Sequence, residues 1–254
     1  MMDYFKYRFS NYIQFNLNEK DFTTILGNNN DLIIFTLLNG HKKCNIFVGD
    51  LELNNKNKYE ISKRMSIVSH RYLDIFVSET VMDEIAFGLE SLAISKDDII
   101  NLITSESRLF KIDDLLERDP YSLGSSDKAK MKILSSLIIK PKILVLDNVI
   151  CELDYKDKLL VFDILNEYTK NGGIVINFTN DIEDALFGKE IKIINDKKII
   201  CEGKTMSVLN EEQLLKRLGI GLPFMIELNK YLMDYGIINK YYLTKEKLVG
   251  AIWK

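Results

Sequence analysis

The stretch KPKILVLDN, residues 140–148, decides the fold of this chain. Its run of consecutive aliphatic residues predicts a strand that is buried on both faces. A Lys-Pro-Lys turn precedes the strand, which ends in one carboxylate, that of Asp147. The stretch therefore predicts a buried strand with a single acidic group at its end.

A helix and a second strand follow this strand. Leu153 and Asp154 come first, then a helical segment that two glycines stop at 172–173, and then the apolar run IVINFT at 174–179. Strands and helices that alternate in this way predict a mainly parallel sheet with crossover connections.

The segments before residue 140 predict an antiparallel start and a helical insertion. Residues 1–26 alternate between apolar and polar side chains around a turn at 18–21, which predicts a hairpin or meander and then a strand that ends at Gly27. The remaining elements are expected as a helix over 32–39, strands over 46–51 and 65–69, a helical pattern over 81–132 with a polar loop at 122–127, a hairpin over 191–201 and helices in the tail.

Composition and charge exclude several classes of protein. The 254 residues suffice for one sizeable domain with a small appendage. The net charge of −3 gives no bulk attraction to nucleic acid, so no nucleic-acid partner is expected. The three cysteines are far apart in sequence and are expected to be buried, reduced thiols. Neither a signal peptide nor an apolar run of about 20 residues is visible, so any membrane role is expected to depend on a partner.

The order of a carboxylate-ending strand, the pair Leu153-Asp154, a helix and a further strand resembles that of the ATP-binding cassette (ABC) ATPases. In that family these are the Walker B strand, the D-loop, a helix and the strand that carries a switch histidine. The resemblance implies an α/β fold, a RecA-like ABC nucleotide-binding domain with an antiparallel β start. That domain is expected over 1–204 with a helical subdomain at 78–127, followed by a C-terminal helical extension over 205–254.

The phosphate-binding loop of the family is altered. A working loop, Gly-x-x-x-x-Gly-Lys-Ser/Thr, offers backbone N–H groups and a lysine to the phosphates and a hydroxyl to Mg²⁺. Here LLNG at 37–40 matches the family's sequence after that loop. Counted back from it, the loop is two residues short, with Asp31 at the lysine position and Leu32 at the hydroxyl position. Gly27, Asn30, Asp31 and Leu32 therefore form a degenerate loop, and an ordinary Asn-rich turn is the alternative.

Three catalytic positions have also changed. Asn148 replaces the glutamate that follows the Walker B aspartate, Asn180 replaces the switch histidine, and His70 stands where the family has a glutamine. Asn148 cannot deprotonate water as a carboxylate does. Asp147 keeps the Walker B position and is a possible Mg²⁺ ligand, with a cap on a local backbone turn as the alternative.

The signature loop, which covers the partner's nucleotide in a cassette dimer, keeps some of its chemistry. The family's Leu-Ser-Gly-Gly-Gln is matched by Leu123 and then Gly124, Ser125, Ser126 and Asp127. The serines keep hydroxyls at the head of a helix, whereas Asp127 adds an unhelpful negative charge. An ordinary helix N-cap is the alternative. The D-loop keeps its aspartate at Asp154.

Two further stretches are similar to one branch of the family, the energy-coupling factor (ECF) ATPases. These are SETVMDEIAFGLE at 78–90, and the tail stretches 218–224 and 243–249, which resemble the C-terminal extension of that branch. By their spacing, Asp83, Glu84, Phe87 and Glu90 share one helical face. In that branch this surface receives a coupling helix of a transmembrane scaffold subunit. A solvated amphipathic helix is the alternative.

The resemblance implies a peripheral subunit at the cytoplasmic face of the cell membrane, in an importer of vitamins or metal ions. Its partners are expected to be a second ABC ATPase subunit, a transmembrane scaffold subunit and, indirectly, a substrate-binding membrane subunit. We expect a catalytically degenerate chain that forms a heterodimer with an active ATPase, with ATP and Mg²⁺ bound only at a shared site. An active ATPase with unusual ligands and a soluble regulatory or scaffold protein of the same fold are the alternatives.

Overall fold

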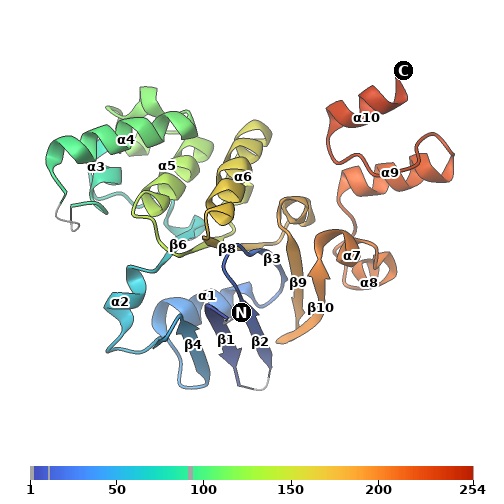
Figure 1. The fold of residues 1–254 in the computed structure, drawn as a ribbon, viewed down its shortest axis with the longest axis horizontal. Coiled ribbons are helices and arrows are strands. Elements are labelled where there is room, and N and C mark those ends of the chain that lie inside the picture. The colour runs from blue at the N-terminus through green and yellow to red at the C-terminus, as the bar shows by residue number, and fades with distance from the viewer. Residues whose placement is uncertain (1–2, 11, 91–93, 254) are drawn as a thin grey trace.

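The computed structural model describes residues 3–10, 12–90 and 94–253 of the chain (Figure 1). Its strands are β1 Phe5–Phe9, β2 Ile13–Leu17, β3 Phe22–Gly27, β4 Cys44–Val48, β5 Leu51–Glu52, β6 Met65–Ser69, β7 Ile143–Asp147, β8 Ile174–Thr179, β9 Glu190–Asn195 and β10 Lys198–Lys204. Its α-helices are α1 Asn30–Asn39, α2 Lys58–Ser62, α3 Val81–Ala86, α4 Lys96–Phe110, α5 Ser125–Leu137, α6 Tyr155–Lys170, α7 Thr205–Leu209, α8 Glu212–Arg217, α9 Phe224–Asp234 and α10 Lys245–Ile252.

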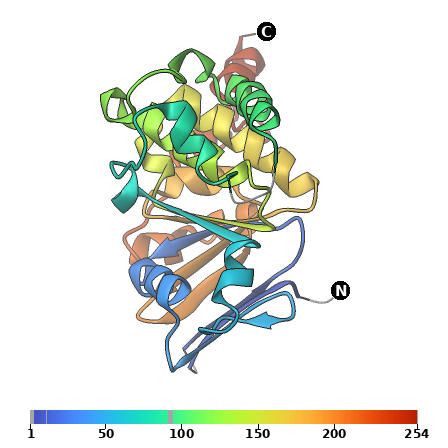
Figure 2. The ribbon, with the colours of Figure 1, turned by 90° about the vertical axis from the view of Figure 1, so that its left-hand side faces the viewer.

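The strands form two sheets. The larger sheet has the order β10-β9-β3-β8-β7-β6, in which only β10 runs antiparallel to its neighbour, and the smaller antiparallel sheet has the order β2-β1-β4-β5. Figure 2 shows α3 to α6 on one side of the larger sheet and the smaller sheet on the other. The predicted α/β class, the antiparallel start and the mainly parallel sheet are therefore confirmed.

The strand β7 explains why residues 143–146 are all apolar. Successive side chains of a strand point to opposite faces. Ile143 and Val145 pack into the cluster between the two sheets, together with side chains of α1. Leu144 and Leu146 pack on the other face, in the cluster beneath α3 to α6. A strand with helices on one face and a second sheet on the other has no solvent-facing side, so it carries no polar alternation.

Two local predictions were wrong. The polar loop predicted over 122–127 ends at Gly124, because Ser125 to Asp127 form the first turn of α5 and Gly124 is its N-cap. The cysteines are not buried: Cys151 is exposed, and the other two are partly exposed. All three thiols are free.

The tail helices α7, α8 and α9 pack against the β9–β10 edge of the larger sheet. Val208, Leu215 and Ile226 share a buried cluster with Ile191 and Ile193 of β9. The last helix, α10, belongs to a smaller cluster with α9, and the hydroxyl of its N-cap residue, Thr244, accepts from Lys247 N. Among the described residues, no helix combines the length and apolar character needed to cross a membrane.

Candidate nucleotide site and partner surfaces

The loop between β3 and α1 contains only Asn28 and Asn29, because β3 ends at Gly27 and α1 begins at Asn30. Both asparagines bind the turn between β9 and β10. Asn28 Nδ2 donates to Asn195 Oδ1 at 2.9 Å, and Asn29 Oδ1 accepts from the backbone N–H of Lys197 at 2.6 Å. A phosphate-binding loop needs several consecutive backbone N–H groups that face a ligand. The two-residue link of Asn28 and Asn29 lies against the β9–β10 hairpin instead, so it supplies no such series of backbone N–H groups.

The first turn of α1 offers neither of the groups that a magnesium nucleotide requires. Asp31 is exposed and forms an ion pair with Arg71, which follows β6. Leu32 is partly buried against the cluster between the sheets. Asn30 points inward, and its Nδ2 lies 3.3 Å from the backbone oxygen of Thr179. The predicted positions therefore carry an acidic group and an alkyl group where a triphosphate and Mg²⁺ need a cation and a hydroxyl.

The ends of β6, β7 and β8 meet beside this loop. Asp147 is buried, and its Oδ2 accepts a hydrogen bond of 2.6 Å from Ser69 Oγ. His70 Nδ1 lies 3.3 Å from the backbone oxygen of Asp147. Asn148 has a φ of +53°, and its N–H donates to the backbone oxygen of Phe178 at 2.8 Å. Asp147 thus binds a neighbouring strand end, and it does not act as the local turn cap that was the alternative prediction.

These residues do not fit a magnesium nucleotide. The fold brings Gly27, His70, Asp147 and Asn148 to one edge of the sheet, with the exposed Asn180 at the end of β8. The link of Asn28 and Asn29 contains no lysine or arginine that could neutralise a triphosphate, and it offers no hydroxyl opposite Asp147. The degeneracy of the nucleotide site stays a prediction.

The head of α5 contains a small ion-pair network. Lys130 is buried, and its Nζ lies 2.9 Å from Asp127 Oδ1 and 3.0 Å from Asp157 Oδ2. Ser126 Oγ donates to the same Asp157 oxygen at 2.6 Å. Burial alone would lower the pKa of Lys130, but hydrogen bonds to the two carboxylates outweigh it and raise that pKa. Asp127 was predicted to add an unhelpful negative charge to the signature loop, and the structure pairs its carboxylate with Lys130, a buried partner that sequence inspection missed.

The D-loop aspartate has a structural role in this chain. Asp154 is the N-cap of α6, where its Oδ1 accepts from the backbone N–H of Asp157 at 2.9 Å. Its own N–H donates to Ser126 Oγ at 3.3 Å, so the Ser126 hydroxyl is engaged on both sides. Ser125 is more accessible, since its hydroxyl makes one long contact of 3.4 Å with the backbone oxygen of Glu152. Of the two signature serines, Ser125 is the one left for an outside partner.

The acidic and aromatic surface differs from its prediction in two ways: Glu84 is turned inward, and α3 ends at Ala86, so that Phe87 is its C-cap and Glu90 lies beyond it. Glu84 is buried: its carboxylate lies 2.7 Å from Lys132 Nζ and accepts from the backbone N–H of Val77 at 2.9 Å. Burial alone would raise the pKa of Glu84, but Lys132 and the backbone donors outweigh it and lower that pKa. The expectation that Glu84 shares an exposed face with its neighbours was wrong. Asp83, Phe87 and Glu90 are exposed.

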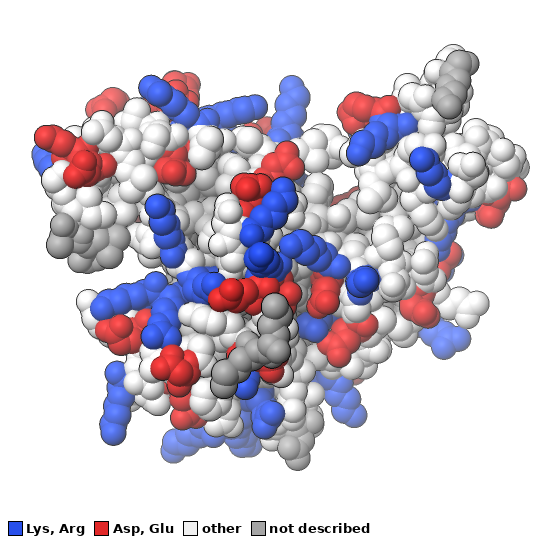
Figure 3. All heavy atoms as spheres, in the orientation of Figure 1, with Lys and Arg blue, Asp and Glu red and all other residues white. Residues whose placement is uncertain are grey.

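Exposed apolar side chains near Phe87 extend this surface. Tyr72, Ile75, Val77 and Phe87 are each more than half exposed. Tyr72 and Ile75 border a shallow pocket beside α5, lined also by Lys132 and neighbouring residues of β6. We call these four residues the apolar docking surface. Sequence inspection missed Tyr72, Ile75 and Val77. The signal that could have found them is that the apolar residues between 72 and 77 follow no helix or strand period. Figure 3 shows acidic and basic side chains interspersed over the face that it presents.

No family model matches the chain. Individual relatives do match it, and they assign it to a family. The ECF transporter ATP-binding protein EcfA of Pediococcus pentosaceus is 30% identical over 193 residues, which cover 76% of this chain and 69% of that protein. EcfA1 of Mycoplasmopsis synoviae is 27% identical over 251 residues, 96% of this chain and 92% of that protein.

Solved structures share the fold. CbiO1 from Clostridium perfringens, described as part of the ABC transporter complex CbiONQ, superimposes with a TM-score of 0.72 at 21% identity, over 92% of this chain and 100% of that one. The dimeric ATP-binding cassette MJ0796, bound to ADP and phosphate, gives 0.69 at 18% identity, over 79% of this chain and 98% of that one. With the ABC ATPase fold in place and the sequence relatives named above, the chain belongs to the family of ECF transporter ATP-binding proteins.

Proposed function

We propose that this chain is the catalytically idle ATP-binding-cassette subunit of an ECF importer for vitamins or metal ions, paired with an active ATPase subunit at the cytoplasmic face of the membrane. One observation carries the proposal: the loop between β3 and α1 has two residues, and both bind the β9–β10 turn. Family membership implies ATP and Mg²⁺ as ligands of the fold, but the residues of this edge do not fit them. The chain would then contribute to transport by binding its partners through the apolar docking surface and the signature loop.

The apolar docking surface supports contact with a membrane scaffold. It joins exposed apolar side chains from the loop after β6 to Phe87 at the end of α3, and exposed apolar groups gathered in this way are typical of interaction sites. The ion pair between the buried Glu84 and the partly exposed Lys132 ties this loop to α3 and α5. A coupling helix that binds here would therefore move both elements together.

The signature loop supports a contribution to the partner's nucleotide site. The N-cap of α5 is Gly124, which has no side chain to bind the free backbone N–H groups of the first turn. Ser125 has an exposed hydroxyl next to them. A shared site would use these groups and Asp154 against a nucleotide held by the partner's own phosphate loop.

The proposal is tested first on the purified chain. Calorimetry with Mg-ATP is expected to show no saturable binding with a Kd below about 1 mM, since no cation or phosphate loop is present. Micromolar binding would refute the idle assignment and favour the alternative, an active ATPase with unusual ligands.

The second test uses the complex reconstituted with the partner ATPase and the membrane subunits. Ser125→Ala and Asp154→Ala are expected to slow its ATPase about tenfold each if each supplies about 1.4 kcal/mol to the transition state. Asp154→Ser keeps an N-cap and separates helix capping from the contact to the partner. Asp147→Asn serves as the matched control and is expected to change turnover less than about twofold. If Asp147→Asn alone stops turnover, the active site belongs to this chain.

Docking is tested on the same complex. Val77→Ser with Phe87→Ser is expected to release the chain from membranes that contain the scaffold, while Tyr12→Ser with Tyr59→Ser, also exposed, is expected to leave it bound. Glu84→Lys is unsuitable for this test, because it would place a second cation beside Lys132 at a buried position. Membrane association that survives the first pair would argue against the apolar docking surface.

A further inference from the structure

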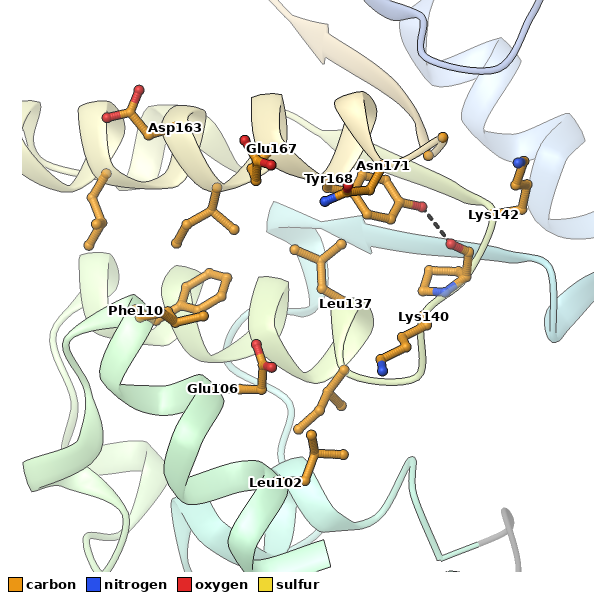
Figure 4. A pocket seen from close by; sticks show the side chains of 17 residues that line it. Leu102, Glu106, Phe110, Leu137, Lys140, Lys142, Asp163, Glu167, Tyr168 and Asn171 are labelled. Carbon is orange, nitrogen blue, oxygen red and sulfur yellow. Dashed lines mark hydrogen bonds between the residues drawn. The ribbon is translucent and has the colours of Figure 1, made fainter.

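A larger concavity lies away from the strand ends and from the apolar docking surface. A cavity of about 830 Å³ opens between α4 and α6, and the end of α5 lies between them. Figure 4 shows α6 along one wall, α4 along the other, and Leu137 of α5 between them. We call it the α4–α6 groove.

Both walls of the groove present a stripe of side chains at helical spacing. On α4 the stripe contains Leu102, Glu106 and Leu109, and on α6 it contains Leu160 and Ile164, with Tyr168 one turn later. Leu109 is 56% exposed although it lines the groove. Two helices that present apolar stripes on either side of an open groove form a site into which a third, amphipathic helix can pack.

The rim of the groove is acidic along both walls. Glu106 projects from α4, and Asp163 and Glu167 lie on α6 (Figure 4). Among the described residues, neither Glu106 nor Asp163 has an ion-pair partner, whereas Glu167 pairs with Lys170 at 3.1 Å. Lys140 lies at one end of the groove, where β7 begins. The groove is therefore apolar inside, negative along its sides and positive at one end.

We propose that the α4–α6 groove binds an amphipathic helix of a partner protein, with lysine or arginine on both sides of its apolar stripe. The wall from Leu160 to Asn171 is about 16 Å long at the rise of an α-helix, enough for about three turns of the bound helix. The flanking cations meet Glu106 on one wall and Asp163 on the other. The negative C-terminal end of the bound helix lies at Lys140.

The partner's helix bridges two parts of the fold, since α4 lies in the helical insertion and α6 follows the Walker B strand. It binds elsewhere than the apolar docking surface, and it needs no nucleotide. Binding of this helix therefore does not depend on whether the chain is catalytically idle.

The probe is a synthetic helical peptide of about fourteen residues, with leucines at helical spacing flanked by lysines, and a twin in which glutamates replace the lysines. Fluorescence anisotropy of the labelled peptides with the purified full chain measures both affinities. The lysine peptide is expected to bind at least about tenfold more tightly than its acidic twin, which corresponds to about 1.4 kcal/mol.

Charge reversal locates the site. Glu106→Lys with Asp163→Lys is expected to invert the preference between the two peptides. Asp97→Lys with Glu117→Lys changes the net charge equally at exposed positions outside the groove and is expected to leave the preference unchanged. Leu109→Ser is expected to weaken the lysine peptide about fivefold, whereas Ile100→Ser, on another face of α4, is expected to have no effect.

Three outcomes would overturn the proposal. Equal binding of both peptides to all variants would mean unspecific adhesion. Sedimentation that shows a dimer broken by Leu109→Ser would mean that a second copy occupies the groove. A fatty acid such as laurate that binds there while the lysine peptide does not would mean a lipid site, with Lys140 as the carboxylate partner.

Discussion

At the residue scale, Lys130 decides the geometry of the head of α5. Its ammonium is buried between Asp127 and Asp157, so its removal leaves two carboxylates without their cation. Lys130→Met is expected to lower the free energy of unfolding by about 3 kcal/mol, because breaking a buried charge cluster costs far more than a surface pair. Urea unfolding followed by circular dichroism measures it.

The control for this variant is Lys128→Met, two residues earlier on α5. Lys128 pairs with the exposed Asp74, and such surface pairs contribute at most about 1 kcal/mol. Equal losses for Lys128→Met and Lys130→Met would contradict the role of the buried network.

Glu84 gives the chain a pH-dependent contribution to stability. Its pKa is lowered in the folded state, mainly because Lys132 and two backbone donors outweigh the effect of burial. A lowered carboxyl pKa stabilises the fold above the unfolded value of about 4.3, and this stabilisation is lost as the pH falls through the folded pKa. Glu84→Gln is expected to cost about 2 kcal/mol at pH 7 and progressively less below pH ~4.

The measurement is thermal unfolding of both proteins between neutral and acidic pH. Glu90→Gln is the matched control, since Glu90 is exposed on the same segment and should not change the curve. A difference between Glu84→Gln and the parent that stays constant with pH would contradict the ionised buried pair.

At the scale of elements, the close contact between β3 and β9 depends on Gly27. Its φ is +138°, and a Cβ built there would lie 1.8 Å from the carbonyl oxygen of Ile194. Gly27→Ala is expected to cost at least about 3 kcal/mol, because backbone atoms must move apart. Gly40→Ala, with φ of +68° and nothing within 4 Å, is expected to cost about 1 kcal/mol. Equal costs in chemical denaturation would refute the close approach.

The short loop between β3 and α1 predicts that point substitutions cannot restore nucleotide binding. Asp31→Lys with Leu32→Ser restores the expected residue types, but the loop still has two residues bound to the β9–β10 turn. Calorimetry with Mg-ATP is expected to show a Kd that stays above about 1 mM. Micromolar binding by this double variant would mean that loop length is not the limiting defect.

At the scale of the whole molecule, the tail presents aromatic side chains to solvent beyond the core. Tyr235 and Trp253 are 82% and 81% exposed. If the tail supports pairing with the second ATPase subunit, Tyr235→Ser with Trp253→Ser should weaken the heterodimer at least about tenfold without lowering the melting temperature. Co-purification and light scattering measure the pairing. An unchanged heterodimer would assign the contact to another surface.

The sequence by itself determined the layers of the fold and the residue types at the expected nucleotide-site positions. The apolar run of β7, the alternation in β1 and β2 and the glycine stops follow local rules of burial and backbone geometry. The substitutions Asp31, Leu32, Asn148 and Asn180 are visible in the chain itself, because they are changes of residue type at positions fixed by short motifs.

Only the tertiary structure decided which side chains are free. Glu84 has the spacing of an exposed face, but Lys132, far along the chain, turns it inward. Lys130 and Asp157 come from different helices, α5 and α6. The α4–α6 groove likewise depends on how α4 and α6 lie relative to each other. Hydrogen bonds and ion pairs depend on distances of a few ångströms between residues that are distant in sequence, and local periodicity contains no information about those distances.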